Sequence, residues 1–135
     1  MGYIEWTNSL NIGFREIDDQ HRVLVDRINS LAEAVELGLD SLSLQGILED
    51  LSAYAAAHFS LEEGYFDRFD YREAGAHKKE HAAFVERVRL FRNDLADGKA
   101  TLSAEVLEFL RSWLTNHIAF SDKKYRSTFL QGGLR

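Results

Sequence analysis

The sequence predicts an all-α protein, an antiparallel up-down-up-down four-helix bundle with an extended N-terminal arm. Four apolar stripes show the three- and four-residue spacing of amphipathic helices. Proline is absent, and Gly38 and Gly98 stand where helices are expected to end. Because the connections between the stripes are short, consecutive helices are expected to be antiparallel neighbours. The 135 residues suit one compact unit, so we expect a single domain over residues 1–135.

Each helix is predicted from its own stripe of apolar residues and histidines. The helices are expected near residues 18–37, 42–66, 74–96 and 104–128, after an arm of residues 1–17 and before a tail of residues 131–135. The stripes are, in order, His21, Leu24, Ile28, Leu31 and Val35; Ile47, Leu51, Tyr54, His58, Leu61, Tyr65 and Phe69; His77, His81, Phe84, Val88, Phe91 and Leu95; and Val106, Leu110, Trp113, His117 and Phe120. Ser103 is placed to cap the start of the fourth helix.

The composition argues against several kinds of function. There is no cysteine, which excludes disulfides and thiolate chemistry. A net charge of −6 repels phosphate backbones and argues against nucleic acid as a partner. No apolar run approaches the roughly 20 residues of a membrane span, and the N-terminus lacks the basic and apolar segments of a signal peptide. We therefore expect a cytoplasmic protein without a membrane span.

All five histidines lie on the predicted stripes, and their positions predict that they meet. His21, His77 and His81 come near the starts of their helices, whereas His58 and His117 come near the ends. In an antiparallel bundle these positions share one end. A lone histidine on an apolar face is usually an ordinary core residue, but five buried imidazoles cannot satisfy one another's single donors and acceptors. A metal takes the lone pairs, so the sequence predicts a metal site.

Two carboxylates accompany these histidines at helical spacing. Glu62 follows His58 by four residues, so the two side chains share one face of their helix. Asp122 follows His117 by five residues, which is about 140° away on a regular α-helix. If Asp122 is a ligand, the helix must widen there, and we expect a π-type turn.

Asp18 and Glu63 also lie near the predicted site. Asp18 suits two roles equally, orienting His21 or capping its helix. Glu63 is expected to be solvated, because it lies one residue off the stripe. The five histidines with Glu62 and Asp122 give seven ligands, too many for one ion and suited to two. Imidazole and carboxylate ligands together favour Fe, Mn, Zn or Cu over Mg or Ca.

The same residues form a pattern that resembles the hemerythrin family in its bacterial single-domain form. The pattern consists of His58-Phe59-x-x-Glu62-Glu63, His77-x-x-x-His81 and Trp113-Leu114-x-x-His117-Ile118-x-x-x-Asp122, together with Trp6, Gly13 and Asp18-Asp19-Gln20-His21. The resemblance covers nearly the whole chain. Two positions depart from it, because the family often has Met where this chain has Phe66 and Tyr-Pro where it has Tyr71-Arg72. Both lie outside the ligand set.

The resemblance implies a non-haem centre of two iron ions per chain with a bridging oxo or hydroxo group. One iron would take His77, His81 and His117, the other would take His21 and His58 and keep an open position, and Glu62 and Asp122 would bridge them. Dioxygen would bind at the open iron as hydroperoxide, with two electrons from the irons and the proton from the bridge. Oxygenation would then leave the net charge of the centre unchanged, which avoids a large cost in a dry core.

The resemblance also implies an apolar wall that keeps bulk water away from the centre. The candidates are Phe59, Trp113, Leu114 and Ile118. For each of them, plain core packing explains the residue type equally well.

The leading interpretation is a non-enzymatic protein that stores, carries or delivers dioxygen. A di-iron oxidase, a peroxidase or a nitric oxide-handling enzyme is one alternative, and an oxygen sensor acting through a partner is another. No histidine follows a Glu by three residues, as in ferritin-like oxidases, and five histidines leave few carboxylates to support high-valent iron. A dizinc hydrolase is weaker still, because His-Glu-x-x-His is absent. The expected partners are dioxygen and an oxygen-consuming protein of unknown identity.

Overall fold

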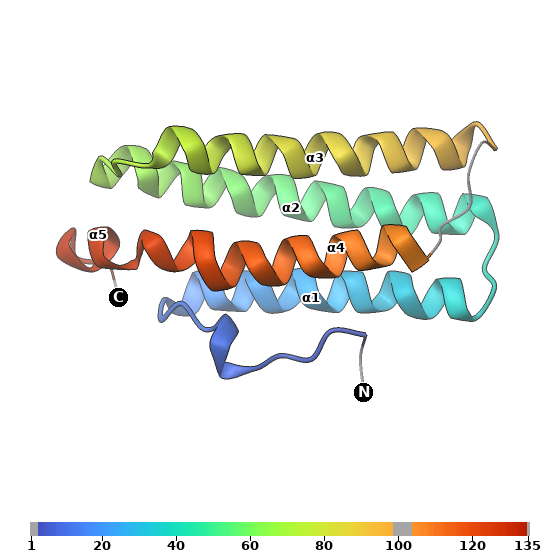
Figure 1. Cartoon of the computed structure of the whole chain (residues 1–135), viewed down its shortest axis with the longest axis horizontal. Helices are drawn as coiled ribbons and strands as arrows, with labels where there is room; N and C mark the ends of the chain where they lie inside the picture. The colour runs from blue at the N-terminus through green and yellow to red at the C-terminus, as the bar shows by residue number, and fades with distance from the viewer. Residues whose placement is uncertain (1–2, 99–103, 135) are drawn as a thin grey trace.

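A computed structural model describes residues 3–98 and 104–134, which form a bundle of four long helices with an arm along one side (Figure 1). The helices α1 (Arg15–Glu36), α2 (Ser41–Phe69), α3 (Ala74–Ala96) and α4 (Ala104–Asn116) alternate in direction along the chain. A π-helical segment, η2 (His117–Asp122), continues α4, and a short helix, α5 (Arg126–Gln131), follows. The predicted antiparallel bundle and its arm are confirmed.

The helix ends follow from the residues that stand there. Gly38 and Gly98 have φ angles of 75° and 70°, the left-handed conformation expected after a helix. Asp40 caps α2 by accepting a hydrogen bond from the backbone N–H of Ser43 at 2.8 Å. Asp70, with a φ of 54°, ends α2 three residues beyond the predicted boundary. Likewise, α1 begins three residues before its predicted start.

The fourth helix differs most from the prediction. Instead of one helix over residues 104–128, the chain forms α4, the wider turns of η2 and then α5. Phe120, predicted on the fourth apolar stripe, is 67% exposed. The wider turns rotate Phe120 away from the face that carries His117. The predicted cap, Ser103, lies outside the described residues.

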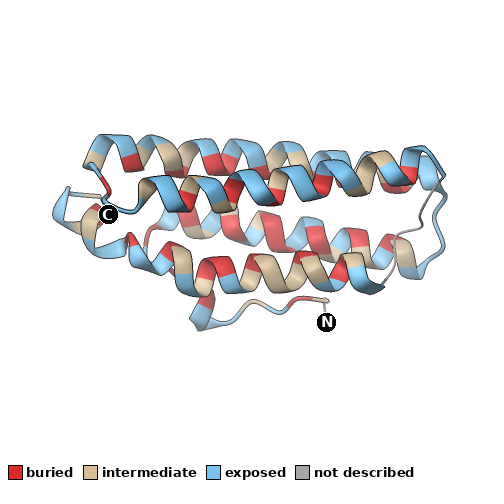
Figure 2. Ribbon diagram, turned by 45° about the horizontal axis from the view of Figure 1, so that its top comes forward, coloured by how far each residue is buried: buried red, intermediate tan, exposed pale blue. Residues whose placement is uncertain are grey.

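The second predicted stripe is also partly wrong, because the core face of α2 is rotated from it. Ile47, Tyr54 and Leu61 are only half-buried. The buried residues of α2 are Leu44, Leu48, Leu51, Ala55, His58, Phe59, Glu62 and Phe66. Since α2 carries apolar residues on several sides, more than one stripe fits its sequence. Burial alternates with exposure along each long helix, as Figure 2 shows.

Hydrogen bonds that involve side chains fasten the arm to the bundle at several points, among them that of the Tyr3 hydroxyl to Glu108 at 3.3 Å. Asn29 exchanges two hydrogen bonds with the backbone of Ile4, at 2.6 and 2.9 Å. Arg126 Nε donates to the carbonyl oxygen of Ile12 at 2.8 Å. Asp18 accepts hydrogen bonds from the backbone N–H groups of Ile12 and Gly13, at 2.7 and 3.0 Å. Asp18 therefore secures the chain entering α1.

Within residues 3–98 and 104–134, no helix combines the length and apolar character that crossing a membrane requires.

Candidate metal centre

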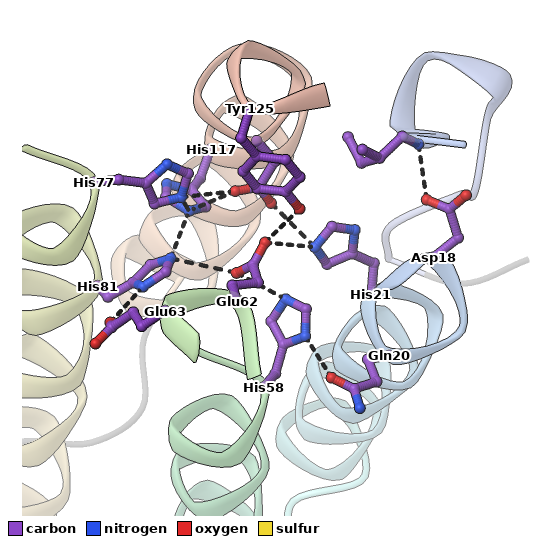
Figure 3. A network of polar contacts seen from close by, with 12 residues as sticks. Asp18, Gln20, His21, His58, Glu62, Glu63, His77, His81, His117 and Tyr125 are labelled. Atoms are coloured by element: carbon purple, nitrogen blue, oxygen red, sulfur yellow. Dashed lines mark hydrogen bonds and ion pairs between the residues drawn. The ribbon is translucent and has the colours of Figure 1, made fainter. Parts of the chain in front are cut away.

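Five histidines and two carboxylates converge at the end of the bundle where α1 and α3 begin and α2 ends (Figure 3). The seven residues are His21, His58, Glu62, His77, His81, His117 and Asp122, and none is more than 4% exposed. They come from α1, α2, α3 and η2. The structure thus brings together every residue that the sequence predicted as a metal ligand, while their role as ligands stays a prediction.

The donor atoms fall into two groups that share both carboxylates. The three-histidine group contains Glu62, His77, His81, His117 and Asp122. The two-histidine group contains His21, His58, Glu62 and Asp122. Within each group the donor atoms lie within 4.8 Å of one another. Two adjacent ions bridged by two carboxylates would use all seven side chains.

Asp122 faces the two groups with different oxygen atoms. Its Oδ1 lies 2.9 Å from His77 Nε2 and 3.1 Å from His117 Nε2. Its Oδ2 lies 3.0 Å from His21 Nε2. The wider turns of η2 bring Asp122 to the same side as His117, although five residues separate them. The helical irregularity predicted from this spacing is confirmed.

Glu62 also lies between the groups, and a buried tyrosine holds it there. Its Oε1 is 3.1 Å from His58 Nε2 and 3.4 Å from His81 Nε2. Its Oε2 accepts a hydrogen bond from the Tyr125 hydroxyl at 2.6 Å. Burial, followed by the charge of Glu62, raises the pKa of Tyr125 well above its usual value, so the hydroxyl stays a donor. Sequence reasoning missed this residue, whose only signal was its place one turn after Asp122.

Three imidazoles have outer partners at Nδ1. The pairs are His58 with Gln20 at 2.7 Å, His81 with Glu63 at 2.8 Å and His117 with Glu80 at 2.9 Å. Each partner atom is an oxygen that only accepts, so Nδ1 carries the hydrogen and Nε2 of the neutral ring is a bare acceptor. The expectation that Glu63 is simply solvated was wrong, because it reaches across to His81 on α3. Glu80 was not identified from the sequence.

The inward-facing atoms fit metal ions better than they fit one another. Six buried atoms of the described residues have no hydrogen-bond partner and belong to this cluster: His21 Nδ1 and Nε2, His58 Nε2, Glu62 Oε1, and Asp122 Oδ1 and Oδ2. Because His21 Nδ1 has no partner and both Asp18 oxygens accept from Ile12 and Gly13, Asp18 does not orient His21, and that alternative was wrong. The Nε2 atoms of His77 and His81 lie 3.0 and 3.1 Å from His117 Nε2. Ligands at right angles around one ion, with bonds of about 2.1 Å, lie about 3 Å apart.

The two buried carboxylates create a demand for positive charge. Burial and the charge of Asp122 would raise the pKa of Glu62, but the charge of His58 and the close approach of His58 and His81 lower it to about 2. Burial opposes protonation of His117, yet the charge of Asp122, whose Oδ1 lies 3.1 Å from Nε2, raises the pKa of His117 to about 9. Without metal ions, protons on the neighbouring imidazoles supply the positive charge that balances the two carboxylates.

The apolar residues predicted as a wall surround the three-histidine group in part. The Phe59 ring stacks on His81, with centroids 3.9 Å apart and planes at 8°. Trp113 stacks on His117 at 4.4 Å and 12°. The other two members of the predicted wall, Leu114 and Ile118, are also buried, and they lie close to His117 in the sequence.

Comparison with known proteins places this arrangement in a family. The model of the hemerythrin HHE cation binding domain matches residues 12–128. Bacteriohemerythrin from Pseudomonas aeruginosa is 34% identical over 125 residues, covering 93% of this chain and 80% of the relative. Bacteriohemerythrin from Methylococcus capsulatus is 32% identical over 128 residues, covering 93% and 95%. A crystal structure of wild-type hemerythrin superposes with a TM-score of 0.88 at 28% identity, covering 94% of this chain and 98% of the other. The chain therefore belongs to the hemerythrin family.

Proposed function

We propose that this protein binds dioxygen reversibly at a non-haem centre of two iron ions with a bridging oxo or hydroxo group. His77, His81 and His117 would hold one ion, His21 and His58 the other, and Glu62 and Asp122 both. When bound, the two irons would supply the two electrons that reversible dioxygen binding requires. The proposal treats residues 1–135 as a single hemerythrin-like domain, non-enzymatic, with dioxygen as its ligand.

The observation that carries the proposal is the unequal number of donors around the two shared carboxylates. One group offers three imidazoles and the other offers two. With both carboxylates shared, the two-histidine group has one donor fewer, which leaves room for an external ligand at that ion. An open position on one of two adjacent metals is what a binding centre for a small molecule needs.

The chain's own residues would protect such a ligand from water and free protons. The seven proposed ligands are at most 4% exposed, so bulk water is excluded from the centre. The Tyr125 hydroxyl keeps its proton and donates a hydrogen bond to Glu62 Oε2 at 2.6 Å. Leu114 and Ile118 add buried apolar surface to the proposed wall. Reversible binding is favoured where protons cannot reach the bound oxygen.

The test is a visible spectrum of anaerobically reduced protein, recorded before air, after air and again after deoxygenation. We expect about two irons per chain and a colour that appears with air and disappears when oxygen is removed. Lasting oxidation with turnover of an added substrate would favour an oxidase or peroxidase instead. One metal per chain, or zinc in protein from iron-replete cells, would refute the di-iron centre.

A further inference from the structure

The two groups of ligands differ in the residues that hold their imidazoles from outside. In the three-histidine group, Glu63 and Glu80 accept hydrogen bonds from His81 and His117. In the two-histidine group, the outer partner of His58 is the neutral amide of Gln20. Figure 3 shows Glu63 and Gln20 on either side of Glu62, each beside the outer nitrogen of its histidine. The outer hydrogen bonds therefore bring two formal negative charges to the three-histidine group and none to the two-histidine group.

Both outer carboxylates have a second element of support. A further hydrogen bond holds Glu80, and the position of Glu63 on α2 next to Glu62 holds Glu63. Glu80 Oε1 also accepts a hydrogen bond from Ser121 Oγ at 2.6 Å. Ser121 belongs to η2, directly before Asp122, so the same segment that places a shared carboxylate also fixes Glu80. Glu63 follows Glu62 on α2 and reaches His81 at 2.8 Å. The side chains of Glu63 and Glu80 are 32% and 44% exposed, so water screens their charges only in part.

A carboxylate behind an imidazole does more than an amide does in the same place. Both fix the ring and its tautomer, because both accept the hydrogen of Nδ1. Only the carboxylate raises the basicity of the opposite nitrogen and adds negative charge near a cation. Loss of such an outer partner typically costs ten- to a hundredfold in metal affinity, about tenfold where solvent screens the charge.

We propose that Glu63 and Glu80 are positioning residues that make the two metal positions unequal, so that the three-histidine position binds its ion more tightly and fills first. This inference rests on the proposed metal centre. It adds an order of loading, set by residues that touch no metal. The two-histidine position, backed by Gln20, is the one that empties first when metal is scarce.

The experiment is a titration of chelator-treated, metal-free protein with Co²⁺, followed by visible absorption and calorimetry. The unmodified protein should bind two ions in two steps of different affinity. His21→Ala assigns the steps, because it should remove the weaker step and keep the tighter one. Glu63→Gln and Glu80→Gln keep an acceptor for Nδ1 but lose the charge. Each should weaken the tight step about tenfold and leave the weak step unchanged.

Two further variants sharpen the comparison. Gln20→Glu places a carboxylate behind His58 and should strengthen the weak step. Glu49→Gln removes an exposed carboxylate from the far end of α2 and should alter neither step. Equal affinities in the unmodified protein, or equal weakening of both steps in the Glu63 and Glu80 variants, would overturn the inference while leaving the metal centre intact. Failure to bind any Co²⁺ or Fe²⁺ would instead refute the proposed function.

Discussion

The two ends of the bundle are built from the same helices but are stabilised differently. At the distal end, where α1 ends and α2 begins, the core is apolar and consists of Leu31, Ala34, Leu44, Leu48, Leu95 and Leu107. At the site end, the same helices bury five imidazoles and two carboxylates. Apolar packing stabilises the distal end by itself, whereas the site end buries polar groups that cost free energy unless cations or protons pair them. The stability of the distal end is therefore independent of bound cations, whereas that of the site end depends on them.

Metal removal should have the largest effect and should act on one end only. Binding to the folded state alone contributes about 4 kcal/mol when free metal exceeds the dissociation constant a thousandfold. We expect a lower Tm and faster amide hydrogen exchange in η2 and the C-terminal half of α2, with little change around Leu48. Exchange before and after chelation measures this. Equal Tm values for both forms, or uniform loss of protection, would break the comparison.

Next in size are single histidine deletions, which should differ between the two groups. His58→Ala leaves its proposed ion with one imidazole and the shared carboxylates, so we expect a protein with one iron that no longer binds dioxygen. His81→Ala leaves two imidazoles in its group, so more iron should remain, but water can enter and the protein should oxidise irreversibly in air. Iron content and the rate of air oxidation test both variants. Identical losses would leave the assignment of histidines to separate ions without support.

Leu48→Ala should destabilise the distal end whether or not metal is present. Leu48 is fully buried, and such truncations cost about 2–5 kcal/mol. Chemical denaturation should show the same loss of unfolding free energy in metal-free and metal-loaded protein, with unchanged metal stoichiometry. Leu42→Ala, at a position 77% exposed, is the matched control and should cost almost nothing. A metal-dependent effect of Leu48→Ala would mean that the two ends are coupled.

Tyr125→Phe should have the smallest effect and should act on the site end. The substitution removes the hydroxyl that donates to Glu62 Oε2 and leaves a buried carboxylate oxygen without that donor, at a cost of about 1–3 kcal/mol. The loss should be greater in metal-free protein, where no cation compensates Glu62. Denaturation of both forms measures it. An equal loss in both forms would show that the hydrogen bond from Tyr125 contributes independently of the metal.

The sequence predicts what periodicity and fixed spacing control. Gly38 and Gly98 predicted two helix ends, and the five residues between His117 and Asp122 predicted the π-helical segment, because each depends on local backbone geometry. The ligand cluster was predictable because position along antiparallel helices determines which end a residue reaches.

What depends on contacts between helices could not be predicted. Glu63 and Glu80 contact histidines on other elements, so the role of Glu63 could not be read from the pattern that contains it, and no local pattern marks Glu80. Phe66 departs from the family pattern, yet its ring lies 4.7 Å from that of His77, measured between centroids. The core face of α2 was predicted from large apolar residues alone. Ala55 is small and Glu62 is charged, so neither entered the predicted stripe, although both are fully buried.

The spread of the proposed ligands along the chain bears on the order of events during folding. Asp122 faces both groups, and it meets His21 only after about a hundred intervening residues have been brought into place. No single helix or adjacent pair of helices supplies the full donor set of either group. The helices themselves form through local contacts, which are fast. We therefore expect the proposed centre to capture its ions late in folding, once the helices that carry its donors have come together.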